Sequence, residues 1–241
     1  MNTNDIFLQD LNAYGLKLDA DQIDKFDLFY NILVSENEKF NLTSVTERVD
    51  VYKKHFIDSL SLCTYGIDLF GDIHIIDIGT GAGFPGIPLK IVFPHLKITL
   101  VDSLNKRISF LENVIDKLKL SNIIPIHGRA EDLAKNSSHR EKYDLCVSRA
   151  VANLSTLTEY CLPFVKPDGL FIAYKVGRGL APAEITDAQN CISLLGGQLD
   201  KRLAFELPNS DITRSLIGVK KISVTPEKYP RRAGLPGKRP L

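Results

Sequence analysis

A run of closely spaced glycines directly after an apolar segment sets the strongest limit on the fold of this chain. Residues 75–89 read IIDIGTGAGFPGIPL, with glycine at positions 79, 81, 83 and 86. Glycine tolerates positive φ and lets the backbone approach another group closely, so this spacing is typical of a tight turn between a strand and a helix. The segment therefore predicts an α/β fold with a ligand bound at the end of a strand.

The same glycines fit two kinds of cofactor loop. Read as Gly81-x-Gly83-x-x-Gly86, they match the dinucleotide-binding fingerprint. That fingerprint places an acidic residue about twenty positions further on, where Asp102 stands. Read from Asp77 as Asp-x-Gly-x-Gly-x-Gly, they match the loop of methyltransferases that use S-adenosylmethionine. We expect the Asp77 carboxylate to face the turn, repelling a pyrophosphate and favouring a sulfonium or an ammonium. The pattern favours S-adenosylmethionine, with a nicotinamide cofactor as the alternative.

Short apolar runs alternate with helical segments after Gly71. Strands are expected near 73–78, 97–101, 123–127, 143–148 and 169–175, and helices near 86–93, 104–119, 153–164 and 181–195. Such alternation implies crossover connections and a mostly parallel sheet with helices on both faces. Two later runs, near 201–207 and 215–224, have no helix between them and predict an antiparallel hairpin at the sheet edge. Together these runs predict a seven-stranded, Rossmann-like sheet.

The amino-terminal part of the chain predicts helices only. One helix is expected from a cap at Asp21, because apolar residues recur at helical spacing between Ile23 and Val34. A second is expected from about Thr46 through Leu60. We therefore divide the chain into a helical extension, residues 1–66, and an α/β domain, residues 67–241.

Residues suited to a ligand stand at the ends of the first four predicted strands, whose carboxyl ends share one edge of the sheet. Asp102 follows the second strand, Ala130 and Glu131 the third, and Ser148 and Arg149 the fourth. In an S-adenosylmethionine site, the glycines would lie near the methionyl part and Asp102 would accept the ribose hydroxyls. Glu131 or the amide beside Ala130 would meet the adenine edge. The alternative for Asp102 is a helix cap.

Composition narrows the class of protein. The 241 residues are 44% hydrophobic and 24% charged, as in an ordinary soluble globular protein. No apolar run approaches the roughly 20 residues needed to cross a bilayer, and the chain starts without a secretory signal pattern, so we expect a cytoplasmic protein. The cysteines form no Cys-x-x-Cys pair, which argues against a zinc site or a disulfide framework.

Charge is unevenly distributed along the chain. Residues 1–40 contain eight acidic and three basic side chains, whereas residues 220–241 contain seven basic side chains and one acidic side chain. A basic end in a nearly neutral protein is a candidate contact for phosphates, and a solvated tail is the alternative. Several prolines and glycines beside the basic residues favour an extended arm that tracks a nucleic-acid backbone.

The segment after the fourth predicted strand bears on the nature of a methyl acceptor. There the chain reads SRAVANL, and it contains no Asn/Asp-Pro-Pro-aromatic stretch of the kind that holds an exocyclic amine. A ring nitrogen with a free lone pair, such as guanine N7, needs no base to deprotonate it. Catalysis on such a target would rest on alignment and electrostatics.

Six segments together resemble the bacterial glucose-inhibited division protein B family (GidB/RsmG). They are FNLTS, HFIDSL, DIGTGAGFPGIPL, HGRAEDL, VSRAVANL and YPRRAGLPGKRPL, and the likeness runs from about Asn41 to the last residue. The resemblance implies a class I methyltransferase fold for residues 67–241 and S-adenosylmethionine as cofactor. It also implies methylation of N7 of one guanine in small-subunit ribosomal RNA near the decoding site, by a monomer that needs no metal.

The resemblance also implies roles for individual residues. Together with the strand-end argument, it gives this set of cofactor-binding residues: Asp77, Gly79, Gly81, Gly83, Phe84, Asp102, Ala130, Glu131 and Arg149. The residues expected near the transferred methyl group are Arg149, Lys175, His55 and Asp58. Those expected at the RNA are Arg129, Lys228, Arg231, Arg232, Lys238 and Arg239.

Two departures and several alternatives accompany this assignment. Glu36 stands where the family often has Trp, and Val176 separates Lys175 from Gly177 where the family usually has Lys-Gly. His55 and Asp58 lie one helical turn apart and could form only a local hydrogen bond. A nicotinamide oxidoreductase and a non-catalytic rRNA-binding or assembly protein remain the other two classes.

Overall fold

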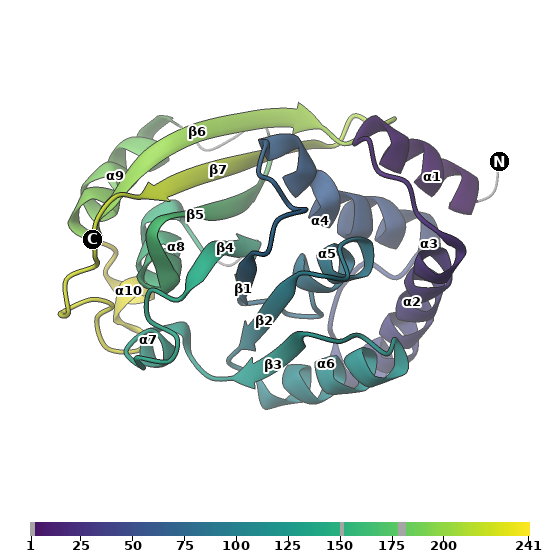
Figure 1. Ribbon diagram of the computed structural model, residues 1–241, viewed down its shortest axis with the longest axis horizontal. Helices are drawn as coiled ribbons and strands as arrows, with labels where there is room; N and C mark the ends of the chain where they lie inside the picture. Colours follow the sequence, from purple (N-terminus) through teal and green to yellow (C-terminus); the bar gives the residue numbers. More distant parts are fainter. Residues whose placement is uncertain (1–2, 150–151, 178–181) are drawn as a thin grey trace.

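A computed structural model describes residues 3–149, 152–177 and 182–241 (Figure 1). Its centre is a seven-stranded sheet in the order β3-β2-β1-β4-β5-β7-β6. The strands are β1 (His74–Ile78), β2 (Lys97–Asp102), β3 (Ile123–His127), β4 (Tyr143–Arg149), β5 (Val165–Val176), β6 (Gly197–Glu206) and β7 (Thr213–Lys221). The first five strands run parallel, and β7 pairs antiparallel with both β5 and β6. The predicted Rossmann-like sheet with its hairpin is confirmed.

Helices cover both faces of this sheet. The α-helices are α1 (Thr3–Ala13), α2 (Ala20–Phe40), α3 (Arg48–Val51), α4 (Asp58–Leu60), α5 (Gly86–Val92), α6 (Asn105–Lys117), α7 (Ala130–Leu133), α8 (Leu154–Cys161), α9 (Pro182–Leu194) and α10 (Leu235–Lys238). A π-helical stretch, η1 (Tyr52–Ile57), joins α3 to α4, and 3₁₀ turns come after α4 at Ser61–Tyr65 (η2) and after α8 at Leu162–Phe164 (η3). Residues 150–151 of the SRAVANL segment and residue 181, at the predicted start of α9, lie outside the described residues.

Two hydrophobic clusters hold the layers together, one on each face of the sheet. Strand β1 shows the division, because Ile75 packs into the cluster that includes the amino-terminal helices, α5 and α6, while Ile76 packs into the cluster with α8 and α9. Alternate residues of a strand point to opposite faces, so Asp77 lies on the same face as Ile75. This placement puts its carboxyl group under α5.

The amino-terminal helices pack on the first of these clusters, at one end of the molecule (Figure 1). Helix α2 begins one residue before the predicted cap, and its cap is Asp19 rather than Asp21. The Asp19 carboxylate accepts from the backbone N–H of Gln22, and the Gln22 side chain accepts in return from Asp19, which forms a capping box. Gln22 also donates to Ile91 O and Val92 O at the end of α5. The domain boundary between residues 66 and 67 stays a prediction.

The carboxyl-terminal segment does not form the extended arm that its prolines and glycines predicted. It folds back on α7 and α8 and ends in the short helix α10 (Figure 1). Thr156 donates to Pro236 O and Ser155 donates to Leu241 O, so α8 binds the segment at two points. Within the described part of the chain, none of the helices is both long and apolar enough to span a bilayer.

Candidate functional site

The Asp77 side chain binds the loop between β1 and α5 from inside the fold. This side chain is fully buried, and its Oδ2 accepts from Thr80 Oγ1 at 2.7 Å and from the Gly86 N–H at 2.9 Å. Burial raises the pKa of the Asp77 carboxyl group to about 7. The expectation that the Asp77 carboxylate faces the turn is therefore corrected, because the carboxyl group supports the loop from inside the fold.

Two glycines of this loop are required by packing. A Cβ atom on Gly86 would lie 2.3 Å from Leu100 Cδ2, and one on Gly83 would lie 2.4 Å from Ile87 Cγ1. By contrast, Gly81 has a φ of +61° and open space where a side chain would stand. The structure thus gives Gly83 a role in helix packing, and its predicted cofactor contact stays a prediction.

A cavity of about 470 Å³ lies where the parallel strands end. It is lined by residues at the ends of four different strands, and these include most of the predicted cofactor set: Gly79, Gly81, Phe84, Asp102, Ala130, Glu131 and Arg149. Of the predicted set, all of which lies in the described part of the chain, Asp77 and Gly83 do not line it. A volume within the range of about 300–1,000 Å³ suits a nucleoside-sized ligand.

Asp102 joins three structural elements at the end of β2. Its Oδ2 accepts from the Gly81 N–H and from Arg107 Nη1, each at 3.0 Å, and its Oδ1 accepts from the Leu104 N–H at 3.0 Å. A carboxylate offers about four acceptor positions. Three of these positions are occupied here, which leaves one free. If both hydroxyls of a ribose are to donate to Asp102, at least one of the three bonds has to be replaced. Arg107 is the exposed partner best placed to be exchanged, since 32% of its side chain is exposed.

The far wall of the cavity is shared with the carboxyl-terminal segment. Glu131 is buried, and its Oε1 accepts from the Gly234 N–H at 2.7 Å. Tyr160 of α8 also lines the cavity, and a Cβ atom on Gly237 would lie 3.3 Å from its hydroxyl group. Arg129 stands exposed at the rim. Glu131, which is predicted to contact the adenine, therefore also binds the carboxyl-terminal segment.

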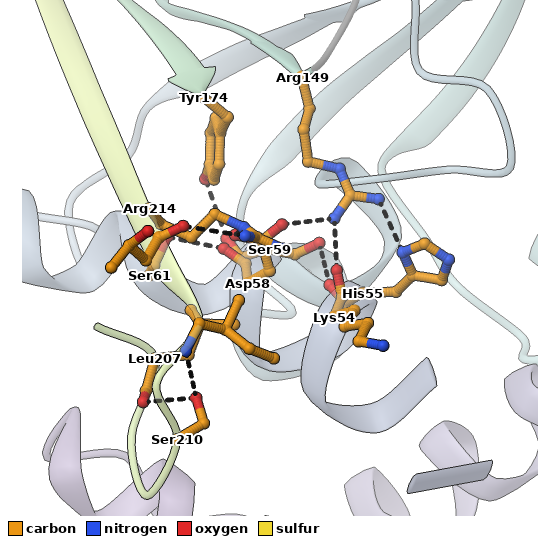
Figure 2. Close-up of polar contacts among 12 residues, drawn as sticks. Lys54, His55, Asp58, Ser59, Ser61, Arg149, Tyr174, Leu207, Ser210 and Arg214 are labelled. Atoms are coloured by element: carbon orange, nitrogen blue, oxygen red, sulfur yellow. Dashed lines mark hydrogen bonds and ion pairs between the residues drawn. The ribbon is translucent and has the colours of Figure 1, made fainter. Parts of the chain in front are cut away.

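Arg149 is the centre of a polar cluster between the sheet and the amino-terminal helices. Figure 2 shows its guanidinium pointing between His55 and Asp58. Nη1 donates to Asp58 Oδ2 at 3.1 Å and to Lys54 O at 3.3 Å. The guanidinium carbon also lies 4.9 Å from the centre of the Phe84 ring, which stacks on His55 at 4.7 Å. Arg149 thus both pairs with a buried carboxylate and lines the cavity.

His55 is neutral at physiological pH. Burial, followed by the nearby Arg149 charge, lowers its pKa to about 3. Arginine can only donate, so Nδ1 of His55 accepts from Arg149 Nη2 at 3.3 Å. The ring proton then lies on Nε2, which is 2.8 Å from Thr43 Oγ1. With its lone pair engaged, this imidazole is poorly suited to act as a general base.

Asp58 binds two arginines. Besides Arg149, it accepts at Oδ1 from Arg214 Nε, 3.0 Å away, and Arg214 reaches it from β7 (Figure 2). The local bond between His55 and Asp58 is made by the backbone, where the Asp58 N–H donates to His55 O. Their side chains are connected through Arg149. Asp58 therefore fastens α4 to the ends of two strands.

Lys175 lies near the Arg149 cluster but forms hydrogen bonds with residues outside it. Its Nζ donates to Ala152 O at 2.6 Å and to Glu184 Oε1 at 3.2 Å. It lines a second, smaller cavity of about 240 Å³, together with Asp58. A role for Lys175 near the transferred methyl group stays a prediction.

The predicted RNA-binding residues divide into two groups. Arg231 is engaged with the fully buried Glu159, to which it donates from Nη2 at 2.6 Å and from Nε at 2.9 Å. It therefore anchors the carboxyl-terminal segment, and its contact with RNA stays a prediction. The other predicted RNA-binding residues of the segment are exposed, and their contact with RNA stays a prediction: Lys228, Arg232, Lys238 and Arg239.

Sequence reasoning missed several lining residues. Thr43 lies in the FNLTS segment, Arg107 comes little more than one helical turn after Asp102, and Tyr160 lies on α8. Arg214 carries no local signal, since its partner Asp58 is 156 residues away. Throughout residues 3–149, 152–177 and 182–241, no group of three or more His, Cys, Asp or Glu side chains is arranged to hold a metal ion.

Comparison with known proteins gives a consistent result. The model of the family described as rRNA small subunit methyltransferase G matches residues 22–206. The chain is 48% identical over 242 residues to the ribosomal RNA small subunit methyltransferase G of Lachnoclostridium phytofermentans, an alignment that covers 100% of this chain and 98% of that protein. It is 50% identical over 227 residues to the protein of the same name from Alkaliphilus metalliredigens, with 94% of each covered.

Solved structures share the fold at low identity. The fibrillarin pre-rRNA processing protein of Methanococcus jannaschii is 14% identical, with a TM-score of 0.51, and the match covers 65% of this chain and 70% of that one. The cyclase SpnF is 12% identical, with a TM-score of 0.53 and coverage of 68% and 80%. At this identity the likeness shows the fold alone, because a fold supports more than one reaction.

Proposed function

The chain belongs to the rRNA small subunit methyltransferase G family, and we propose from this premise that it methylates N7 of one guanine in bacterial small-subunit ribosomal RNA, near the decoding site. S-adenosylmethionine is the methyl donor. We place the enzyme in the cytoplasm as a monomer. The structural observation that supports a nucleoside-containing donor is the cavity at the strand ends, lined by residues at the ends of β1, β2, β3 and β4.

The residues of this cavity suit the donor. Gly79 and Gly81 leave the backbone open to the methionyl part, while Asp102 and Glu131 offer acceptors for the ribose and the adenine. When bound, S-adenosylmethionine supplies a methyl group on a positively charged sulfur. The Asp77 carboxyl group keeps the glycine loop in shape from beneath through Thr80 and Gly86. Since Asp77 does not face the cavity, the choice against a dinucleotide rests on family membership and not on its charge.

The cluster around Arg149 agrees with attack by a ring nitrogen. Guanine N7 carries a free lone pair, so no base has to remove a proton before the methyl group is transferred. Accordingly, His55 is neutral and its Nδ1 lone pair is occupied by Arg149. The side chains near the methyl group therefore act by alignment and electrostatics. We propose Arg149, His55, Asp58 and Lys175 in these positions.

Exposed basic residues would hold the RNA backbone. Arg129 stands at the rim of the cavity, and Lys228, Arg232, Lys238 and Arg239 are exposed on the carboxyl-terminal segment that packs beside it. Contacts of this kind supply affinity and position without reading sequence. Arg231 supports them indirectly, because it fixes the segment to Glu159.

Transfer of a labelled methyl group tests the proposal. The protein is incubated with labelled S-adenosylmethionine and with small-subunit rRNA, either naked or within the subunit, and large-subunit rRNA serves as the control. We expect label in the small-subunit rRNA, either naked or within the subunit, and no label in the large-subunit rRNA. Donor binding and rRNA binding without incorporation would favour the non-catalytic assembly protein, and tight NAD binding with no affinity for S-adenosylmethionine would favour the oxidoreductase.

A further inference from the structure

A second cavity adjoins the cofactor cavity. It measures about 240 Å³ and lies between the α3–α4 helical segment and the ends of β5 and β7. His55 and Arg149 line both cavities, so these two side chains stand at their junction. A ligand in the second cavity would meet a cofactor in the first one there.

The size and walls of the second cavity suit a small group with both apolar and polar surface. Its volume lies below the range of about 300–1,000 Å³ that holds drug-sized ligands. Val45, Val176 and Leu216 contribute apolar surface, and Tyr174 adds an aromatic ring. Apolar walls with a few convergent polar groups are typical of sites for small heterocycles.

The charges around this cavity are already paired. Arg149 and Arg214 both bind Asp58, Lys175 binds Glu184, and Lys54 binds Asp50. A phosphate would have to compete with these carboxylates for the cations. A neutral base would not, so an uncharged heterocycle fits the cavity better than a backbone phosphate does.

We propose that the second cavity receives the target guanine, turned out of the RNA, and presents its N7 to the first cavity between His55 and Arg149. The assignment rests on the proposed function. Enzymes that modify a base take it out of its stack and hold it in such a pocket. In the transfer, the N7 lone pair forms the new C–N bond while the C–S bond breaks and leaves its electron pair on sulfur. No proton moves, and the positive charge passes from sulfur to the purine.

Obstruction of the cavity tests this proposal. Val176 lies 74% exposed at the end of β5, so Val176→Trp places an indole ring at the cavity without disturbing the core. Val45 is half-buried and packs against the core cluster, so Val45→Trp also obstructs the cavity and its Tm shows whether the core tolerates the ring. The matched controls are Val224→Trp and Val49→Trp, at positions 63% and 51% exposed that do not line the cavity. The experiment measures kcat/KM for methylation of whichever rRNA form the wild type accepts, the affinity for S-adenosylmethionine and the Tm.

The result expected is a loss of about a hundredfold in kcat/KM in at least one cavity variant, because misplacement of a reacting group by ~1 Å has an effect of that order. Donor affinity and Tm should match those of the control variants. Methylation at the wild-type rate by both cavity variants would overturn the assignment and leave the proposed function intact. A wild-type protein that methylates no rRNA would instead refute the proposed function, and the pocket assignment with it.

Discussion

Two buried carboxyl groups perform different tasks in this molecule. Asp77 is uncharged over part of the physiological range and holds a loop, whereas Asp58 holds two arginines. The surroundings of each carboxyl group, rather than its position in a sequence motif, determine its task. Changes to the two side chains should therefore have different consequences, one seen in the pH profile and the other in stability at neutral pH.

Asp77 should make stability depend on pH. Its pKa is about 7 in the folded protein, against an ordinary value of 3.8. A raised folded pKa means that the stabilising contribution is fully present below about pH 3.8 and is lost as the pH rises through about 7. The full difference is of the order of 4 kcal/mol. Urea unfolding of the wild type and of Asp77→Asn between pH 4 and pH 8 should show the wild type losing stability relative to the variant. Parallel pH profiles would contradict the raised pKa.

Removal of the Asp58 carboxylate should leave two arginines without their partner. The Arg149 and Arg214 side chains are each only 13% exposed. Asp58→Ala is therefore expected to lower the free energy of unfolding by about 3–5 kcal/mol. The control is Asp50→Ala, which breaks an exposed pair with Lys54 and should cost less than about 1 kcal/mol. Similar urea midpoints for the two variants would show that the buried cluster is not stabilising.

At the level of elements, the loop between β1 and α5 needs glycines for two reasons: close packing of α5 on the sheet and open backbone at the cavity. Gly83 and Gly86 let α5 approach the sheet, whereas Gly81 lies open at the cavity. The sequence predicted the loop and its neighbours, but local spacing did not distinguish packing glycines from cavity glycines. The alternation within β1 was the available signal that Asp77 faces inward, since Ile75 lies on the same face.

Alanine substitutions at Gly86 and Gly81 should separate the effect of these glycines on stability from their effect on donor binding. Gly86→Ala places a methyl group against Leu100 and should lower the free energy of unfolding by about 1–3 kcal/mol through overpacking. Gly81→Ala meets no neighbour and should cost about 1–2 kcal/mol from its positive φ, with its main effect on donor binding. Thermal unfolding and donor titration of both variants measure the two effects. Equal donor affinities in both variants would argue against a cavity role for Gly81.

The carboxyl-terminal segment shows where sequence reasoning ends. Its charge was read correctly, but its path depends on contacts far away in the chain, such as Arg231 with Glu159, 72 residues apart, and Gly234 with Glu131, 103 residues apart. No local pattern encodes such pairs. The Asp19 cap differs, because the spacing from Asp19 to Gln22 was itself a capping-box signal.

Adjacent arginines of this segment should behave differently. Arg231→Ala leaves the buried Glu159 unpaired and should lower the free energy of unfolding by about 3–5 kcal/mol. Arg232→Ala changes an exposed side chain, so stability should stay unchanged while rRNA binding weakens and its salt dependence falls by about one phosphate contact. Urea unfolding and rRNA titration at several salt concentrations test both statements. An Arg232→Ala variant with wild-type rRNA affinity would remove this residue from the interface.

For the whole molecule, alternation of strands and helices was enough to predict a parallel sheet with a terminal hairpin. The larger cavity lies at the sheet edge where the sequence predicted a ligand, since ligands of such folds gather at the carboxyl ends of the strands. Binding of a ligand there stays a prediction. The contribution of the amino-terminal helices was implied only by family resemblance. They supply His55 and Asp58, which Arg149 joins from the opposite side. This cluster therefore forms only when the helices and the sheet pack together.

The reaction as a whole is defined by the atom that accepts the methyl group, which we propose to be N7 of one guanine in small-subunit rRNA. After incubation with S-adenosylmethionine, the rRNA is reduced with borohydride and treated with aniline, which cleaves the chain at 7-methylguanosine. We predict one cleavage that depends on both enzyme and donor, and slower appearance of that cleavage in at least one of the Val176→Trp and Val45→Trp variants. Incorporation of label into rRNA that resists this cleavage would contradict the proposal, because the methyl group would then lie on another atom.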